Sequence, residues 1–395
     1  MKKTYLFPGQ GSQKRGMGGD LFDEFPELTQ KADEILGYSI KELCLNDPNK
    51  ELNKTQFTQP ALYVVNALSY QKKIKDGETP PDFVAGHSLG EYNALQAAEV
   101  LSFEEGLKLV KMRGELMSKA ENGGMAAILN SSEAEIKNIL EEANLTSIDI
   151  ANLNAPTQIV VSGKKDDINE AQGFFEKADI MFIPLNTSGA FHSRYMKEAG
   201  REFERVARKV KFTKAKIPVI ANVNARPYRR DRVAKNLANQ ISNCVRWTDT
   251  IHYLLEKGDM QFEELGVGDV LTKLQRYIEK SYYADNPAAK PAEKAPEEVK
   301  AEAPKTTEQT APETQKPVAA KEIADTTITA TSNPNEMVES WNKNYAIGTK
   351  VKSDFYEDVL ETRTEAVMLF GHRAAVYMKG YNGYFDLREV QPVQA

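Results

Sequence analysis

The segment at residues 86–90, Gly-His-Ser-Leu-Gly, constrains this chain more than any other feature. It directly follows the apolar run Phe-Val-Ala at 83–85 and precedes a stretch of helical character that begins near Glu91. A Gly-x-Ser-x-Gly sequence between a strand and a helix forms a tight, strained turn, in which glycine avoids the collisions that a Cβ atom would cause. The turn lifts the serine hydroxyl above the sheet and leaves backbone N–H groups free beside it. The pattern predicts that Ser88 is a nucleophile in an α/β fold; a glycine-rich packing turn is the alternative.

Four histidines could provide the base that a serine nucleophile requires. His87 is adjacent to Ser88, and the turn should point it away. His252 lies in a helix-like stretch where a packed histidine is expected, and His372 falls beyond a long polar segment. His192 lies in a loop of small residues after an apolar strand, where functional residues concentrate. We therefore expect His192 to be the base, while the chain order identifies no third residue that orients it.

An arginine on an apolar helix face is the next candidate. Residues 103–120 have helical periodicity, with Lys and Glu on one stripe and Leu, Val and Met on the other, and Arg113 falls within the apolar stripe. A lone buried cation is costly, so Arg113 needs a partner. That partner is either a carboxylate of this chain or a substrate carboxylate held by two hydrogen bonds. Downstream of a serine turn, the substrate carboxylate is favoured.

Together with other motifs in the same order, these segments resemble the malonyl-CoA:acyl-carrier-protein transacylase family over most of residues 1–285. The matching stretches are residues 7–13 (Phe-Pro-Gly-Gln-Gly-Ser-Gln), 58–62, 86–92, 111–114, 152–156, 189–193 and 243–247. The resemblance implies that Ser88 carries the acyl group and that His192 is the base. It also implies that the backbone N–H groups of Gln10 and Leu89 form the oxyanion hole, and that the backbone carbonyl of Asn243 orients the histidine.

The same resemblance implies how the substrate is held. Arg113 would bind the malonyl carboxylate, Gln59 would line the same pocket, and Phe191 directly before the histidine would favour malonyl over methylmalonyl. The substrates would be malonyl-CoA and the phosphopantetheine thiol of an acyl carrier protein, with no metal and no redox cofactor. The family's Gly-Pro-Gly-Lys turn is replaced here by Gly-Val-Gly-Asp at residues 266–269.

Three units are predicted along the chain. Residues 1–285 should form a hydrolase-like parallel-sheet core, interrupted at 124–187 by the β-α-β-β-α-β order of a ferredoxin-like subdomain. The active site would lie in the cleft between them. Residues 286–334 are rich in Ala, Pro, Lys, Glu and Thr and lack aromatics, so we expect a disordered linker. Residues 335–395 should form a small all-β domain, SH3-like or an open barrel, that docks a protein partner.

Composition restricts the partners and the compartment. The net charge of −6 gives no reason to expect nucleic-acid binding. The two cysteines, Cys44 and Cys244, indicate a reducing compartment without a disulfide framework or zinc site. The first residues lack the apolar run of a signal peptide, and the uncharged stretch at 55–71 has the composition of a core helix rather than a membrane span. We expect a cytoplasmic protein that does not bind membranes.

These observations predict an enzyme of fatty-acid synthesis that transfers malonyl through a malonyl-serine intermediate. A trans-acting acyltransferase that loads a polyketide synthase would share all of the motifs. A serine thioesterase or other hydrolase would share the serine turn, but Arg113 and the inserted subdomain count against it. A non-enzymatic scaffold is the remaining alternative, and the retention of Ser88, His192 and Arg113 together counts against that class.

Overall fold

The computed structural model describes residues 1–187, 189–290, 333–353, 356–369, 373–379 and 384–393. Its body, residues 1–290, is built on a sheet in the order β8-β7-β2-β1-β9. The strands are β1 (Lys2–Phe7), β2 (Phe83–Gly86), β7 (Val219–Ala221), β8 (Arg226–Pro227) and β9 (Met260–Glu264). All pairings are parallel except that of β8 with β7. The predicted α/β core with a parallel sheet is therefore present, while its likeness to hydrolases stays a prediction.

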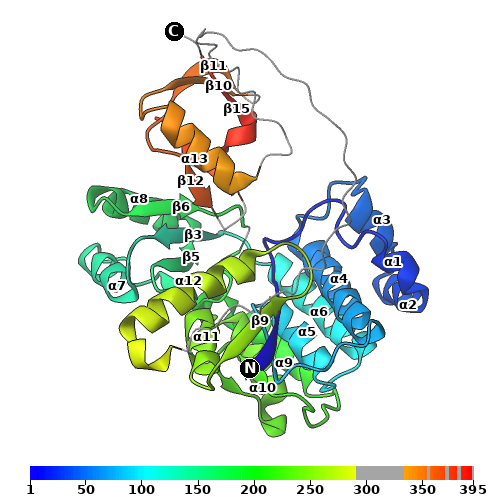
Figure 1. Cartoon of the computed structure of the whole chain (residues 1–395). Helices are drawn as coiled ribbons and strands as arrows, with labels where there is room; N and C mark the ends of the chain where they lie inside the picture. The colour runs from blue at the N-terminus through cyan, green and yellow to red at the C-terminus, as the bar shows by residue number, and fades with distance from the viewer. Residues whose placement is uncertain (188, 291–332, 354–355, 370–372, 380–383, 394–395) are drawn as a thin grey trace, which may run out of the picture.

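Helices cover both faces of this sheet (Figure 1). The alternation along β1 explains why, since Tyr5 and Phe7 pack into one hydrophobic cluster and Leu6 into another. The first cluster contains residues of α4 and α6, and the second those of α11 and α12. The helices of the body are α1 (Leu21–Glu24), α2 (Pro26–Leu36), α3 (Ile40–Leu45), α4 (Thr55–Lys75), α5 (Gly90–Ala97), α6 (Phe103–Ser118), α9 (Lys197–Ala207), α10 (Val233–Ile241), α11 (Trp247–Leu255) and α12 (Val270–Asp285), with short 3₁₀ turns η1 (Arg194–Met196), η2 (Arg230–Arg232) and η3 (Pro287–Ala289).

The inserted subdomain has the predicted β-α-β-β-α-β order. Its elements are β3 (Gly123–Leu129), α7 (Glu133–Glu142), β4 (Asp149–Ala155), β5 (Gln158–Lys164), α8 (Lys165–Lys177) and β6 (Met181–Pro184). The sheet is antiparallel in the order β4-β5-β3-β6. One face packs against α7 and α8 through residues such as Ile136 and Phe175. The other face, with Met125 and Val160, joins the hydrophobic cluster of the body, so the subdomain is held against the large sheet.

The predicted β region of the C-terminal module is present, and a helix that was not predicted precedes its strands. The module opens with helix α13 (Pro334–Asn344), whose Met337 and Trp341 lie one turn apart and are buried. Asn333 caps this helix by accepting a hydrogen bond from the Asn335 N–H, and Pro334 occupies the first turn, where its missing N–H costs nothing. The strands are β10 (Lys350–Ser353), β11 (Tyr356–Glu361), β12 (Val367–Leu369), β13 (Arg373–Tyr377), β14 (Tyr384–Asp386) and β15 (Val390–Pro392), with the 3₁₀ turn η4 (Leu387–Glu389).

These strands form two antiparallel sheets, β11-β10-β15 and β12-β13-β14. A bridge between Thr362 and Met378 joins them. Residues 370–372 and 380–383 of the predicted β domain lie outside the described residues. So does most of the predicted linker, of which residues 286–290, 333 and 334 are described.

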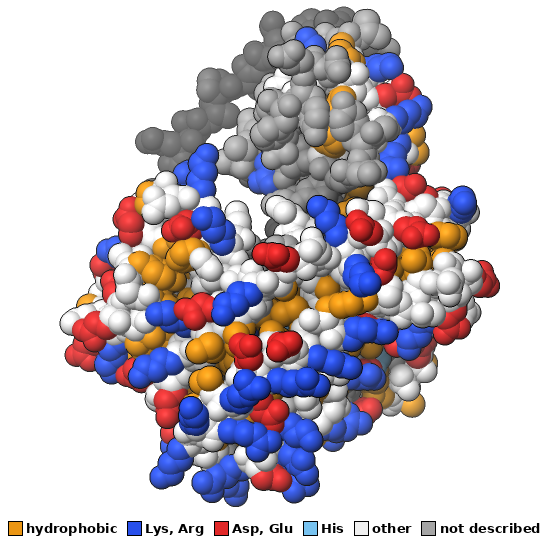
Figure 2. Space-filling model, turned by 180° about the vertical axis from the view of Figure 1, so that it is seen from behind, with side chains coloured by type: hydrophobic (Ala, Val, Ile, Leu, Met, Phe, Trp, Pro, Cys, Tyr) orange, Lys and Arg blue, Asp and Glu red, His pale blue; other side chains and the backbone are white. Residues whose placement is uncertain are grey.

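The charge of the body is unevenly distributed. Residues 201–235 contain twelve Lys or Arg and only three Asp or Glu, although the whole chain has a net charge of −6. Figure 2 shows these cations gathered at the end of the body away from the C-terminal module, where α9 and α10 lie. This basic face favours approach of an acidic partner. Among the described helices, none is long and apolar enough to cross a membrane.

Candidate active site

Ser88 stands on a turn whose glycines are required by close backbone packing. A Cβ atom on Gly86 would lie 1.9 Å from the carbonyl carbon of Gly90, and one on Gly90 would lie 2.0 Å from the carbonyl oxygen of Phe7. The turn between β2 and α5 therefore presses directly against β1. Ser88 itself has a φ of 50°, a strained value for a residue with a side chain. Its N–H donates to Asn222 Oδ1 at 2.8 Å, which holds this conformation.

His192 meets Ser88 across 104 residues of chain, as predicted. The Oγ of Ser88 lies 2.8 Å from Nε2 of His192, and Nδ1 lies 2.7 Å from the backbone carbonyl oxygen of Gln240. Because a carbonyl only accepts hydrogen bonds, Nδ1 carries the proton and Nε2 is free to accept the serine proton. Burial, reinforced by the nearby Arg113 cation, lowers the pKa of His192 to about 3. The imidazole is therefore neutral and ready to act as a base at pH 7.

The backbone carbonyl of Gln240 contacts the histidine and can orient it, beside the predicted carbonyl of Asn243. Both residues lie at the end of α10, where the last carbonyl groups of a helix have no partner inside the helix. The Asn243 backbone also raises the pKa of His192, but it is the smallest of the five causes, whereas the Gln240 hydrogen bond is the largest that opposes burial. Gln240 is therefore an orienting residue that was not predicted, and the orienting role of Asn243 stays a prediction.

Arg113 is buried on α6 and points at the nucleophile. Its Nη2 donates to Ser88 Oγ at 3.0 Å and to Gln240 Oε1 at 2.9 Å. Its guanidinium carbon lies 5.7 Å from the ring centre of Tyr92, and its Nε has no hydrogen-bond partner among the described residues. Within that part of the chain no carboxylate forms an ion pair with Arg113. The buried cation thus keeps hydrogen-bonding capacity for a substrate carboxylate.

A cluster of hydrogen-bonded side chains next to the serine turn, built around Gln240 and Glu91, was not predicted from the sequence. Gln240 Nε2 donates to the backbone carbonyl of Ser88 at 2.7 Å and to the carboxylate of Glu91. Glu91 also accepts from the Asn222 N–H at 2.9 Å and from the Tyr228 hydroxyl at 2.7 Å. Burial outweighs these bonds and raises the pKa of Glu91 to about 7. The cluster links the serine turn, the arginine and α10 into one rigid unit.

The two backbone N–H groups assigned to the oxyanion hole are available. Neither the N–H of Gln10 nor that of Leu89 donates to any acceptor in the described part of the chain. The loop after β1 is close to the serine turn, because a Cβ on Gly9 would lie 2.4 Å from the carbonyl oxygen of His87. Two free donors beside a serine hydroxyl can stabilise the negative oxygen of a tetrahedral intermediate.

A cavity of about 530 Å³ opens over the nucleophile, between the inserted subdomain and the rest of the body. Its lining includes the predicted catalytic and substrate-binding residues Ser88, His192, Arg113, Gln59 and Phe191, and also Gln10, whose N–H was assigned to the oxyanion hole. Its volume lies within the usual range of ligand sites. The Oε1 atom of Gln59 is buried and has no partner among the described residues, so it offers a further polar contact.

The other histidines do not act at the nucleophile. His87 Nε2 lies 2.8 Å from Asn154 Oδ1, and its ring packs on Trp247, so it points away from Ser88 as predicted. His252 lies on α11 against Tyr282, and His372 is outside the described residues. In the described ranges no group of three or more His, Cys, Asp or Glu side chains could hold a metal ion.

Comparison with known proteins agrees with the family resemblance that the sequence motifs of the body indicate. The family model of the acyl transferase domain matches residues 4–296. The polyketide biosynthesis malonyl CoA-acyl carrier protein transacylase PksC of Bacillus subtilis is 61% identical over 279 residues, which are 70% of this chain and 97% of PksC. The malonyl CoA-acyl carrier protein transacylase of Synechocystis is 40% identical over 277 residues, 69% of this chain and 92% of that protein.

A solved structure is also similar. The malonyl CoA-acyl carrier protein transacylase of Burkholderia pseudomallei shares 51% identity with a TM-score of 0.69, over 71% of this chain and 98% of its own. The C-terminal module, which begins at Pro334, lies beyond the residues that the family model matches.

Proposed function

Because this chain belongs to the acyl transferase family of malonyl-CoA:acyl-carrier-protein transacylases, we propose that it moves malonyl from malonyl-CoA to the phosphopantetheine thiol of an acyl carrier protein. The observation that carries the proposal is the buried Arg113 cation, which has no carboxylate partner among the described residues and lies 3.0 Å from the hydroxyl of Ser88. A guanidinium in this place recognises an acyl group that ends in a carboxylate.

Acylation begins when Ser88 Oγ attacks the thioester carbon of malonyl-CoA and Nε2 of His192 takes the hydroxyl proton. The carbonyl oxygen becomes negative and accepts hydrogen bonds from the N–H groups of Gln10 and Leu89. The carbon–sulfur bond then breaks, and the departing CoA sulfur receives the proton from His192. The products of this step are malonyl-Ser88 and free CoA thiol.

The second step repeats the chemistry with the carrier thiol as the nucleophile. His192 Nε2 removes the thiol proton, and the sulfur attacks the ester carbon of malonyl-Ser88. The ester bond to Ser88 Oγ breaks, and the serine oxygen recovers the proton from the histidine. We propose that no metal or redox cofactor takes part, since proton transfer and backbone donors supply each step. The basic face near α9 and α10 offers a docking surface to an acidic carrier protein.

The pathway that receives the malonyl group has two candidates. Fatty-acid synthesis is the expectation from the sequence motifs. Loading of a polyketide synthase is favoured by the greater identity to PksC, 61% against 40% for the Synechocystis transacylase. We propose the polyketide role for this reason, in the cytoplasm that the cysteine content indicates. The ratio of kcat/KM values for purified polyketide and fatty-acid carrier proteins tests it, and a preference for the fatty-acid carrier would reverse the assignment.

Intact-mass measurement of the acyl-enzyme tests the core of the proposal. After brief mixing with malonyl-CoA, the parent protein should gain the mass of one malonyl group, and the Ser88→Ala variant should gain none. The adduct should persist in buffer and disappear on addition of a phosphopantetheinylated carrier protein. Loss of the adduct at the same rate in buffer alone would show a hydrolase instead of a transferase.

A further inference from the structure

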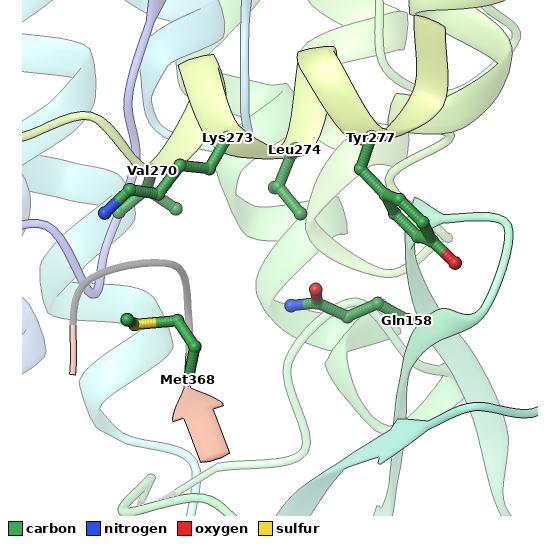
Figure 3. A pocket seen from close by; sticks show the side chains of 6 residues that line it. All are labelled: Gln158, Val270, Lys273, Leu274, Tyr277 and Met368. Atoms are coloured by element: carbon green, nitrogen blue, oxygen red, sulfur yellow. The ribbon is translucent and has the colours of Figure 1, made fainter. Parts of the chain in front are cut away.

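The C-terminal module forms one wall of a second cavity at the edge of the active site. This cavity has a volume of about 190 Å³ and lies between α12, the start of β5 and strand β12 (Figure 3). Its lining residues are Gln158, Val270, Lys273, Leu274, Tyr277 and Met368. Three of them, Gln158, Val270 and Leu274, also line the larger cavity over Ser88. The small cavity therefore adjoins the catalytic cavity, and we call it the outer cavity.

Contacts between the module and the rest of the chain hold Met368 in this wall. Arg363 of the module forms an ion pair with Glu176 of α8 at 3.2 Å. Ala375 and Tyr377 on β13 are buried in the main hydrophobic cluster of the body, and Val367 packs against that cluster. Such apolar burial fixes the β12–β13 side of the module against the catalytic machinery. That side is therefore already occupied, and it is not a free surface for a protein partner.

The side chains in the cavity match a long, flexible, mixed-polarity ligand. Val270, Leu274 and Met368 supply apolar surface, and in Figure 3 Met368 faces α12 across the gap. The Gln158 amide points into this gap and makes no side-chain hydrogen bond within the described residues. Lys273 pairs with Asp269 at 3.1 Å, and because this ion pair is partly exposed, its ammonium group can be shared with an anion at little cost.

Resting on the proposed function, we propose that this outer cavity takes the pantetheine arm of the thioester substrate and that Met368 determines how the arm enters. Pantetheine is an extended chain with two amides and apolar methylene and methyl groups, and in CoA and in a carrier protein its far hydroxyl is esterified to a phosphate. Its amides match Gln158, its apolar groups match Met368 and Leu274, and its phosphate matches Lys273. The module thus completes the substrate channel of the enzyme to which it is attached.

Substrates of different length test the inference on the full-length chain. Malonyl-CoA carries the whole arm, whereas malonyl-N-acetylcysteamine ends after the first amide and lacks the part of the arm that the proposal places in the outer cavity. Met368→Trp should lower kcat/KM for Ser88 acylation by malonyl-CoA about tenfold, because it fills the channel, and leave the short thioester unchanged. Val359→Trp adds similar bulk to an exposed position of the module and should change neither rate. An equal fall for both thioesters, or no fall for either, would overturn the proposal.

A charge variant keeps the test independent of packing in the module. Lys273→Gln should weaken use of malonyl-CoA about fivefold and spare the short thioester, whereas Lys280→Gln on the same helix should change neither. If the parent fails to form malonyl-Ser88 at all, the proposed function is wrong. The affinity of free CoA for the parent and for Met368→Trp, measured by calorimetry, then decides the inference, and equal affinities would refute it.

Discussion

Replacing Arg113 by alanine tests the origin of malonyl selectivity. The guanidinium is buried and donates to the Ser88 hydroxyl, so a bound malonyl carboxylate would receive charge-assisted hydrogen bonds where the surroundings exclude water. Truncating one partner of such a pair costs about 2–5 kcal/mol. The kcat/KM for malonyl-CoA should therefore fall about 30-fold to several thousandfold. Acetyl-CoA has no carboxylate to lose, and its use should hold or rise.

Two further measurements distinguish loss of carboxylate recognition from a general loss of folded structure in Arg113→Ala. The Arg113 charge is the second cause of the lowered pKa of His192, so its removal should raise the pKa of that imidazole toward the ordinary value. The fall in acylation rate at low pH should then begin at a higher pH. Unfolding stability should not decrease in proportion, because the fold buries this cation without an ionic partner among the described residues.

The assay is pre-steady-state acylation of Ser88 by malonyl-CoA and by acetyl-CoA, followed by intact mass. Lys108→Ala, an exposed position on the same helix, is the matched control and should behave as the parent. Arg113→Lys should fall between parent and alanine, since lysine keeps the charge without the paired donors. An equal loss with both thioesters would mean that Arg113 has a structural role and that the reasoning is refuted.

Three other changes have defined outcomes. His192→Ala should slow malonyl-Ser88 formation by about 10²–10⁴-fold. In the parent, the rate of this step should stay level from pH 8 to below pH 6, because the pKa of about 3 keeps the His192 imidazole neutral. A pH profile with a midpoint near pH 6.5 would contradict this. Glu91 has a pKa of about 7 in the folded protein against an ordinary value of 4.5, so between these pH values the folded protein binds one proton more than the unfolded chain. The free energy of unfolding should therefore fall by up to about 3 kcal/mol as pH rises through 7. Chemical denaturation at pH 5 and 8 should show this loss in the parent and not in Glu91→Gln. Trp341→Ala should destabilise the module by about 3–5 kcal/mol in a hydrogen-exchange experiment while sparing acylation by the short thioester; unchanged protection of the module would contradict its burial there.

The chemistry of the site could be predicted where a residue type is rare or breaks a pattern. Ser88 stands out because two glycines flank it between a strand and a helix, and His192 because the surroundings of the other three histidines place them away from the nucleophile. Arg113 interrupts an apolar stripe. Gln240 breaks the buried face of α10 in the same way, one residue before Ile241, so the same criterion identifies it. Its role still depends on where α10 lies relative to the serine turn, which only tertiary packing decides.

The C-terminal module shows the opposite case. The Asn-Pro sequence at 333–334, with Met337 and Trp341 one turn apart, signals a helix start and a buried face. This helix start was not recognised, because the Pro-rich stretch that was assigned to the linker extends to Pro334. The position of the module over the active site could not be predicted, since the contacts of Arg363 and Met368 join segments that are far apart in the chain.

The position of β1 between β2 and β9 affects when this protein can become active during synthesis. Strand β1 is made before the other strands of its sheet, and it pairs with Phe83–Gly86 on one side and with Met260–Glu264 on the other. Its second edge stays unpaired until about 260 residues have been made. His192 is oriented by α10 only shortly before that point. A nascent chain therefore carries Ser88 without its oriented base until α10 and β9 have been made, and it acquires the ability to form an acyl-enzyme only when the sheet closes.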